Sequence, residues 1–261
     1  MPWSQLLFQP CFAREPICKQ CVTYRSRKLT PARAADYSPS KVTDFTTAQM
    51  SLEIPEVVIN RLPVYARALT ELALSGETVV SSQALGELLD VTPAQIRKDL
   101  SYFGRFGKQG RGYNVNSLLS TLREILGIDR QWRLCLVGVG RLGQAIAEYG
   151  GFGPQGFEIV AAFDANPAVI GREIGGVIVH PIDELERFLR SHRVDIGIVA
   201  VPAVDAQGVV DKLVAFGIHA ILTYAPITAH VPRDVTIRHI DPVLAMQSMT
   251  FYIKRSEPGG K

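Results

Sequence analysis

Apolar residues recur every three or four positions from residue 55 to residue 74, a spacing that predicts an amphipathic helix. A short second helix is predicted over residues 81–90, because serines at its start can cap it. A third helix is predicted over 92–103, since Thr92 is a good N-cap and Pro93 suits the first helical position. Three helices with a tight second-to-third turn predict a helix-turn-helix arrangement.

The third helix has one apolar stripe and several polar faces. Ile96, Leu100 and Phe103 are spaced as a buried stripe. The remaining faces carry side chains that commonly bond to phosphates and base edges, namely Gln95, Arg97, Lys98, Ser101 and Tyr102. A charged face alone would also fit a solvated helix. Its position after a tight helix pair favours DNA binding.

A glycine-rich basic stretch follows over residues 104–112, where four glycines alternate with Arg105, Lys108 and Arg111. Such a stretch predicts a hairpin wing that can approach a DNA groove closely. Residues 95–112 hold five basic residues against one acidic residue. We therefore predict a winged helix-turn-helix domain over residues 50–127, with a connecting helix at 117–126.

The second half opens on a buried strand at 132–137, a G-x-G-x-x-G run, and a helix at 144–149. That order is the context in which this motif binds dinucleotides: the glycines allow a tight turn and close approach of a pyrophosphate. The residues predicted to bind a cofactor here are Gly138, Val139, Gly140, Arg141, Leu142 and Gly143. A glycine-rich turn without a ligand is the alternative.

Two further features fit a nucleotide site. Asp164 follows a strand at 158–163 and lies where an acidic residue bonds the adenosine ribose, so NAD(H) is favoured over NADP(H). Val201 and Pro202 end a later strand at the edge where a nucleotide would lie.

Strands and helices then alternate, which predicts an α/β fold with a doubly wound parallel sheet over residues 128–240. The remaining elements are expected as strands at 177–179, 194–201 and 218–222 and as helices at 182–190 and 206–216. The C-terminal segment, 241–261, contains an apolar stretch at 243–253 that we expect to pack against a partner subunit.

Composition, charge and cysteine content lead to three further expectations. The chain has 261 residues, 47% hydrophobic and 20% charged, and lacks 18 consecutive apolar residues, so we expect a cytoplasmic globular protein without a membrane span. Residues 1–49 lack periodicity and carry seven basic against three acidic residues, which predicts a disordered extension. Three cysteines lie in that extension without a second ligand pair, so no metal site is expected.

Catalytic motifs are not evident. The five histidines occur singly, and no nucleophile elbow, zinc-binding helix or P-loop is present. Binding without turnover is the simpler interpretation. The alternatives are an NAD-dependent oxidoreductase with an accessory N-terminal domain and a CoA-binding module.

The run Gln-Ile-Arg-Lys-Asp-Leu-Ser-Tyr-Phe-Gly at 95–104, followed by Gly-Val-Gly-Arg-Leu-Gly at 138–143, resembles the Rex family of redox-sensing transcriptional repressors. The resemblance covers about residues 52–256. It implies a homodimer that binds an inverted-repeat operator through winged-helix domains. It also implies Rossmann domains, closed by a swapped C-terminal helix, that bind NADH and NAD+. NADH would release the dimer from DNA, and no catalysis is implied.

The same resemblance implies a state-dependent network of an arginine, a tyrosine and an aspartate, matched here by Arg67, Tyr149 and Asp241. Pro242 departs from the bulky apolar residue that relatives can carry beside the nicotinamide. Residues 1–49 have no counterpart in the family pattern.

Overall fold

The computed structural model describes residues 54–104, 106 and 112–256. The extension predicted at 1–49 therefore lies outside the described residues. The first part of the described chain, up to residue 125, is mostly helical, and its strands are two residues long. Its elements are α1 (Glu56–Leu74), β1 (Val79–Val80), α2 (Ser82–Leu89), α3 (Pro93–Ser101), β2 (Tyr113–Asn114) and α4 (Val115–Ile125).

Side-chain caps fix where these helices begin. The Ser81 hydroxyl accepts a hydrogen bond from the Ala84 backbone N–H at 3.0 Å, and the Thr92 hydroxyl accepts one from Gln95 N–H at 3.2 Å. Both caps satisfy a backbone donor that has no acceptor within its own helix. The predicted starts of the second and third helices are confirmed within a residue.

The turn between α2 and α3 is tight because two backbone segments nearly touch. Asp90 adopts a left-handed conformation, with φ of +54°, and ends α2. A Cβ atom at Gly86 would overlap the carbonyl oxygen of Val91. Position 86 therefore requires glycine for space, although glycine is a poor helix former.

One cluster of buried side chains joins all four helices of this part. Leu62 and Tyr65 of α1, Leu85 of α2, Ile96 of α3 and Leu122 of α4 are at most 1% exposed. The helical spacing predicted an amphipathic first helix and a buried position for Ile96 of the third. The predicted third helix was too long, because α3 ends at Ser101 and Phe103 packs on the cluster from the following turn.

Two short strands that were not predicted flank α2 and α3. β1 and β2 pair antiparallel, with Val80 opposite Tyr113 and Val79 opposite Asn114. β2, which follows the predicted wing, therefore pairs with a strand that precedes α2. Residues 105 and 107–111, including the basic Arg105, Lys108 and Arg111, lie outside the described residues.

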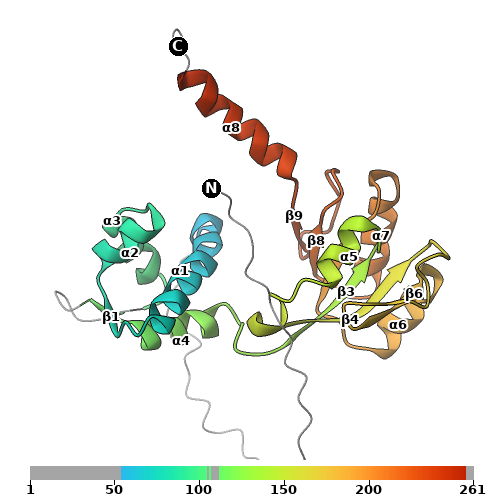
Figure 1. The fold of residues 1–261 in the computed structure, drawn as a ribbon, viewed down its shortest axis with the longest axis horizontal. Coiled ribbons are helices and arrows are strands. Elements are labelled where there is room, and N and C mark those ends of the chain that lie inside the picture. Colours follow the sequence, from blue (N-terminus) through green and yellow to red (C-terminus); the bar gives the residue numbers. More distant parts are fainter. Residues whose placement is uncertain (1–53, 105, 107–111, 257–261) are drawn as a thin grey trace, which may run out of the picture. The chain divides into compact units, whose positions relative to one another are not determined.

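A seven-stranded sheet forms the second part, in the order β5-β6-β4-β3-β7-β8-β9 (Figure 1). All neighbouring strands are parallel except β5 and β6. The strands are β3 (Trp132–Val137), β4 (Phe157–Asp164), β5 (Glu173–Ile174), β6 (Val177–Pro181), β7 (Ile196–Val199), β8 (Ala220–Thr223) and β9 (Thr236–His239). The predicted doubly wound parallel sheet is confirmed.

Helices cover both faces of this sheet. α5 (Arg141–Ala147) packs on the face that carries Leu134 and Leu136, whereas α6 (Leu185–Ser191) and α7 (Ala203–Ala215) pack on the face of Cys135 and Val137. Alternate residues of β3 therefore belong to two separate clusters, as expected for a strand buried on both faces. Burial raises the pKa of the Cys135 thiol to about 12, so this cysteine is an unreactive core residue.

Several predicted boundaries were wrong by two or three residues. α5 begins at Arg141 rather than 144, α7 at Ala203 rather than 206, and β7 spans only the middle of the predicted 194–201. The short strands β5 and β9 were missed. β9 is a polar four-residue edge strand, which carries almost no periodic signal.

The last helix, α8 (Pro242–Ser256), belongs to none of the buried clusters. Its apolar side chains are all more than half exposed, namely Val243, Leu244, Met246, Met249, Phe251, Tyr252 and Ile253. No helix among the described residues is long and apolar enough to cross a membrane.

The close approach in the α2–α3 turn generates a stability prediction. Gly86→Ala should destabilise α2 and α3 by about 1–3 kcal/mol, because the new methyl must displace the Val91 carbonyl. Hydrogen exchange of peptides from these two helices measures the effect locally.

Gly208→Ala is the matched control, since that helical glycine has no atom within 4 Å of an added Cβ. It should leave its helix unchanged or stabilise it by up to about 1 kcal/mol. Unchanged or slower exchange in Gly86→Ala would contradict the prediction.

Candidate functional site

The loop after β3 runs so close to the neighbouring strand that Gly138 has no room for a side chain. Gly138 has φ of +95°, and a Cβ there would lie 2.5 Å from the carbonyl oxygen of Ala200, which directly follows β7. A Cβ at Gly143 would overlap the carbonyl oxygen of Gly138, which holds α5 against the loop. Two of the three glycines of the predicted motif therefore have a steric requirement in this structure.

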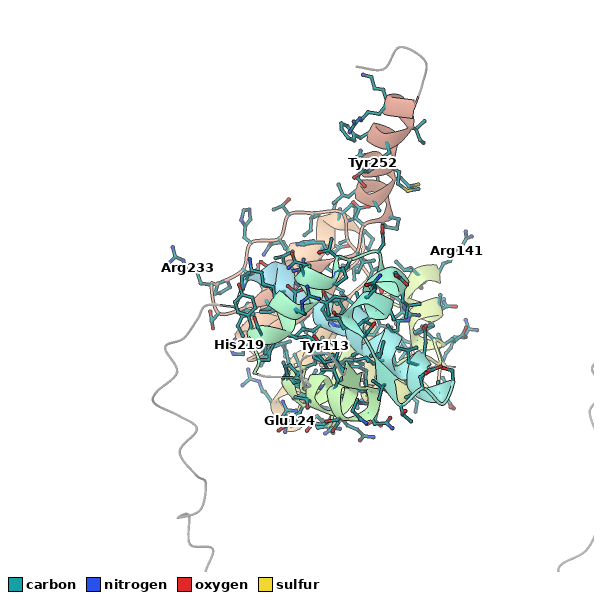
Figure 2. The ribbon with its side chains drawn as sticks, turned by 90° about the vertical axis from the view of Figure 1, so that its left-hand side faces the viewer. Tyr113, Glu124, Arg141, His219, Arg233 and Tyr252 are labelled. Carbon is teal, nitrogen blue, oxygen red and sulfur yellow. The ribbon has the colours of Figure 1, made fainter. Side chains whose placement is uncertain are left out.

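Gly140 is different, because an added Cβ would meet nothing within 4 Å. It is the N-cap of α5, and the open space before it is what a close ligand would need. The first-turn N–H groups of α5 have no acceptor inside the helix, so they can bind an anion. Leu142 is about half exposed, and Arg141 extends its side chain outward (Figure 2).

Asp164 ties the end of β4 to this loop. Its Oδ2 accepts a hydrogen bond from the Val139 backbone N–H at 2.5 Å, and its Oδ1 accepts one from Asn166 N–H at 2.7 Å. Each carboxylate oxygen has a second lone pair, so both can still accept a hydrogen bond from a hydroxyl. The carboxylate is half-buried and fixed at two points before any ligand arrives.

A cavity of about 420 Å³ opens where these elements meet, at the carboxyl ends of β3, β4 and β7. Five predicted cofactor residues line it: Gly138, Gly140, Asp164, Val201 and Pro202. Val139, Arg141, Leu142 and Gly143 do not line it. Val139 turns its side chain into the core, and Gly143 packs under the loop.

Residues that sequence reasoning missed complete the wall. Ile182 follows β6, and Asp205 and Lys212 lie on α7. The two α7 residues are seven positions apart and therefore share a helix face. That spacing was visible in the sequence, but only the packing of α7 tells which face meets the cavity.

The predicted DNA-contacting side chains of α3 lie mostly at the surface. Lys98 is exposed, and the exposed Arg97 donates a hydrogen bond from Nη1 to the Ser82 hydroxyl at 2.9 Å. The Ser101 hydroxyl donates to the Lys98 carbonyl oxygen at 2.7 Å, while Tyr102 is half-buried. Gln95 is also half-buried and donates to the carboxylate of Asp99 at 2.7 Å.

The three residues of the expected network make local contacts. Arg67 lies 3.9 Å from Glu71 on the same helix, the Tyr149 ring packs edge-on against Phe152, and Asp241 caps α8 through the Val243 N–H. A network among Arg67, Tyr149 and Asp241 therefore stays a prediction.

Metal ligation was not expected. Across residues 54–104, 106 and 112–256, no three His, Cys, Asp or Glu side chains gather closely enough to hold an ion. The cysteines at positions 11, 18 and 21 lie outside these ranges.

Comparison with protein families gives two matches in the order that the two parts predict. Residues 53–101 match the family described as "Putative DNA-binding protein N-terminus", and residues 129–227 match the family described as "CoA binding domain". The first match covers the helices α1 to α3, and the second covers the loop and the cavity.

Curated relatives match over most of their length. The redox-sensing transcriptional repressor Rex of Chloroflexus aggregans is 52% identical over 203 residues, which is 78% of this chain and 96% of that protein. The Rex of Roseiflexus sp. (strain RS-1) is 53% identical over 78% of this chain and 92% of that protein. The Rex of Streptomyces coelicolor is 41% identical over 80% of this chain and 81% of that protein.

Solved structures agree. RSP in complex with β-NAD+ and operator DNA is 39% identical, with a TM-score of 0.74, over 77% of this chain and 93% of that one. RSP in complex with β-NADH is 37% identical, with a TM-score of 0.72, over 78% of this chain and 95% of that one. A third structure describes RSP as a Rex-family repressor.

The names of these relatives distinguish between the two functions that the sequence left open, a transcriptional regulator and an oxidoreductase. Their names are those of transcriptional repressors, although the cavity lies in a sheet of the type that many dehydrogenases share. The predicted regulator is confirmed, and the oxidoreductase alternative is not supported. With identities of 41–53% over most of each protein, this chain belongs to the Rex family of redox-sensing transcriptional repressors.

Proposed function

We propose that this protein represses transcription by binding an inverted-repeat operator and that NADH, bound in the cavity beside Gly138, releases it from the DNA. The cavity supports this proposal, because a glycine-rich loop, a helix start and Asp164 meet there in a chain whose described part begins with a helix-turn-helix. NAD+ leaves the protein competent to bind. The crystal structures of RSP with β-NAD+ and operator DNA and with β-NADH support both ligand classes.

The residues present fit a dinucleotide. Gly138 and Gly140 leave room for the pyrophosphate, and backbone N–H groups at the start of α5 bind it. Val201 and Pro202 bound the cavity on the β7 side. The chain's own role is to bind and orient the ligand, because a sensor needs differential affinity rather than turnover.

Asp164 selects the ribose. Its carboxylate accepts hydrogen bonds from the adenosine ribose hydroxyls and repels a 2′-phosphate, so NADH binds better than NADPH. The Val139 and Asn166 N–H groups hold the carboxylate in place, which lowers the cost of ordering it on binding.

The exposed side of α3 faces the operator. Arg97, Lys98, Ser101 and Tyr102 contact phosphates and base edges in the major groove, and the basic wing with Arg105, Lys108 and Arg111 contacts the adjacent groove. The exposure of Arg97 and Lys98 supports these roles. We place this activity in the cytoplasm, where the DNA and the nicotinamide pool are found.

A homodimer follows from the operator symmetry and from α8. An inverted repeat requires two recognition helices related by a two-fold axis. The apolar side chains of α8, more than half exposed in the single chain, support burial of this helix in a partner subunit. NADH then favours a closed dimer that no longer fits the operator. This regulation requires NADH to prefer that arrangement more strongly than NAD+ does.

Binding to the DNA upstream of the protein's own operon, followed by fluorescence anisotropy, tests the function. Added NADH should release the protein and NAD+ should not. The coupling free energy between NADH binding and operator binding should be about 1–3 kcal/mol. Arg97→Ala and Lys98→Ala are the controls: both should abolish operator binding and leave NADH binding intact. Tight DNA binding that is indifferent to both nucleotides would contradict redox sensing.

Asp164→Ala should weaken NADH binding about 10- to 150-fold, because hydrogen bonds to a charged group contribute about 1.5–3 kcal/mol. Calorimetric titration with NADH measures this loss.

The same titration with NADPH separates the ribose role from damage to the Val139 loop. NADPH should lose much less affinity, because the substitution also removes a repulsive charge. Parallel losses for both nucleotides would show that Asp164 only supports the loop.

Leu244→Glu combined with Phe251→Glu should convert a dimer into a monomer, since the two residues are seven positions apart and share a face of α8. Light scattering distinguishes one 28.6 kDa chain from two. Thr250→Glu adds a charge to another side of the same helix without removing apolar surface and should stay dimeric. Two chains per particle in the double variant would refute the role of α8.

A further inference from the structure

Asp99, in the middle of α3, is completely buried. It and Thr223 are the two polar or charged residues in the core of the described part of the chain. A buried carboxylate without partners is very costly, so its surroundings must supply donors. None of the buried side-chain nitrogen or oxygen atoms within the described ranges lacks a hydrogen-bond partner.

Four hydrogen bonds reach this carboxylate from three side chains. Arg61 of α1 donates from Nε to Oδ2 at 2.6 Å and from Nη2 to Oδ1 at 2.8 Å, a two-point contact. The Tyr65 hydroxyl, one turn further along α1, donates to Oδ2 at 2.6 Å. Gln95, one turn earlier on α3, donates from Nε2 to Oδ1 at 2.7 Å. Asp99 therefore fastens the recognition helix to α1.

The same contacts set the charge of the group. Burial by itself would raise the pKa of Asp99, but the hydrogen bonds from Arg61, Tyr65 and Gln95 together with the Arg61 charge hold it below its usual value. The hydrogen bonds that Arg61 donates to Asp99 raise the pKa of Arg61 in turn. At neutral pH, Asp99 is an ionised carboxylate, which only accepts hydrogen bonds.

The Asp99 carboxylate can only accept hydrogen bonds, and this fixes the orientation of the Gln95 amide. The oxygen and nitrogen of an amide are ordinarily hard to tell apart by shape, but a carboxylate can face only the NH2 group. Oε1 of Gln95 therefore points away from Asp99. Gln95 is the third residue of α3, and residues near the start of a recognition helix contact base edges.

We propose that Asp99 is a positioning residue for operator recognition, which holds the Gln95 amide with Oε1 toward the DNA so that Gln95 reads a base-edge amino group. In the major groove, adenine N6 and cytosine N4 present such a donor, whereas guanine and thymine present acceptors. Gln95 is thus specific for adenine or cytosine at one position of each half-site. The inference rests on the proposed DNA-binding function.

Arg61 and Tyr65 have a supporting part in this arrangement. They satisfy the carboxylate from the α1 side, so Asp99 keeps its charge and its place whether or not DNA is bound. The Gln95 amide is therefore already oriented before DNA binds, which lowers the entropic cost of binding.

Selection from a random-sequence duplex library with the full-length protein, followed by sequencing, tests the proposal. The wild-type protein should enrich an inverted repeat with adenine or cytosine at one position of each half-site. Gln95→Met should lose that preference about ten-fold and retain the others. Failure of the wild-type protein to enrich any motif would refute the DNA-binding function itself, which is a separate outcome.

Asp99→Asn is the decisive variant. An asparagine amide can also donate, so Gln95 can turn over and present its NH2 group to the DNA. The asparagine NH2 then takes the place of Oδ1, and the Arg61 Nη2 contact at that atom is lost. The variant should then tolerate guanine or thymine at the Gln95 position, while the preferences elsewhere and the salt dependence of binding stay unchanged. A merely structural role would weaken all positions together, and that result, or an unchanged profile, would overturn the proposal.

Two measurements keep the test informative if Asp99→Asn folds poorly. Gln95→Met leaves the Arg61 and Tyr65 contacts in place, so an unaltered base profile in that variant overturns the proposal by itself. Gln83→Met is the matched control, because the Gln83 amide is exposed on α2 and donates to Glu87 rather than to Asp99. It should leave the base profile and the salt dependence of binding as they were.

Discussion

The nucleotide site depends on the position of β3, which pairs with β4 on one side and with β7 on the other. From β3 the chain proceeds to β4 on one side, and β7 later pairs on the other side, so the carboxyl end of β3 lies at the point where the connections diverge. The loop that leaves β3 at this point passes directly beside the carbonyl oxygen of Ala200, and only glycine fits there at position 138. The cavity, the start of α5 and the contact of Asp164 with Val139 all follow from that passage.

Two carboxylates organise the two parts of this protein, and they do so in different ways. Asp164 is half-buried and accepts backbone N–H bonds, so it keeps lone pairs for a ligand. Asp99 is fully buried and accepts four side-chain bonds, so its capacity is used inside the fold. In the proposed function, the first carboxylate contacts the ligand directly, whereas the second acts through the Gln95 side chain. Burial, rather than residue type, separates the two roles.

The sequence could predict the features that depend on neighbouring residues. Thr92 and Pro93 predicted where α3 begins, and the glycine spacing with Asp164 predicted one side of the cavity. The contact between Arg61 and Asp99 could not be predicted in this way, because it joins residues 38 positions apart. The same limit applies to Lys212, whose place in the cavity depends on how α7 packs on the sheet. Gln95 illustrates the consequence: its spacing predicted a surface residue, and its packing against Asp99 makes it half-buried.

Regulation of such a protein needs two arrangements that its ligands stabilise unequally. The core of the helical part and the two cores of the sheet part are separate clusters of well-packed side chains, and close-packed cores move as units rather than deform gradually. A change in the nucleotide can therefore reach the recognition helix only by shifting whole parts of the molecule. Because Asp99 fastens α3 to α1, a shift of α1 carries the DNA-reading face with it. A loosely held recognition helix would instead absorb the shift, and the nucleotide would lose its effect on the operator.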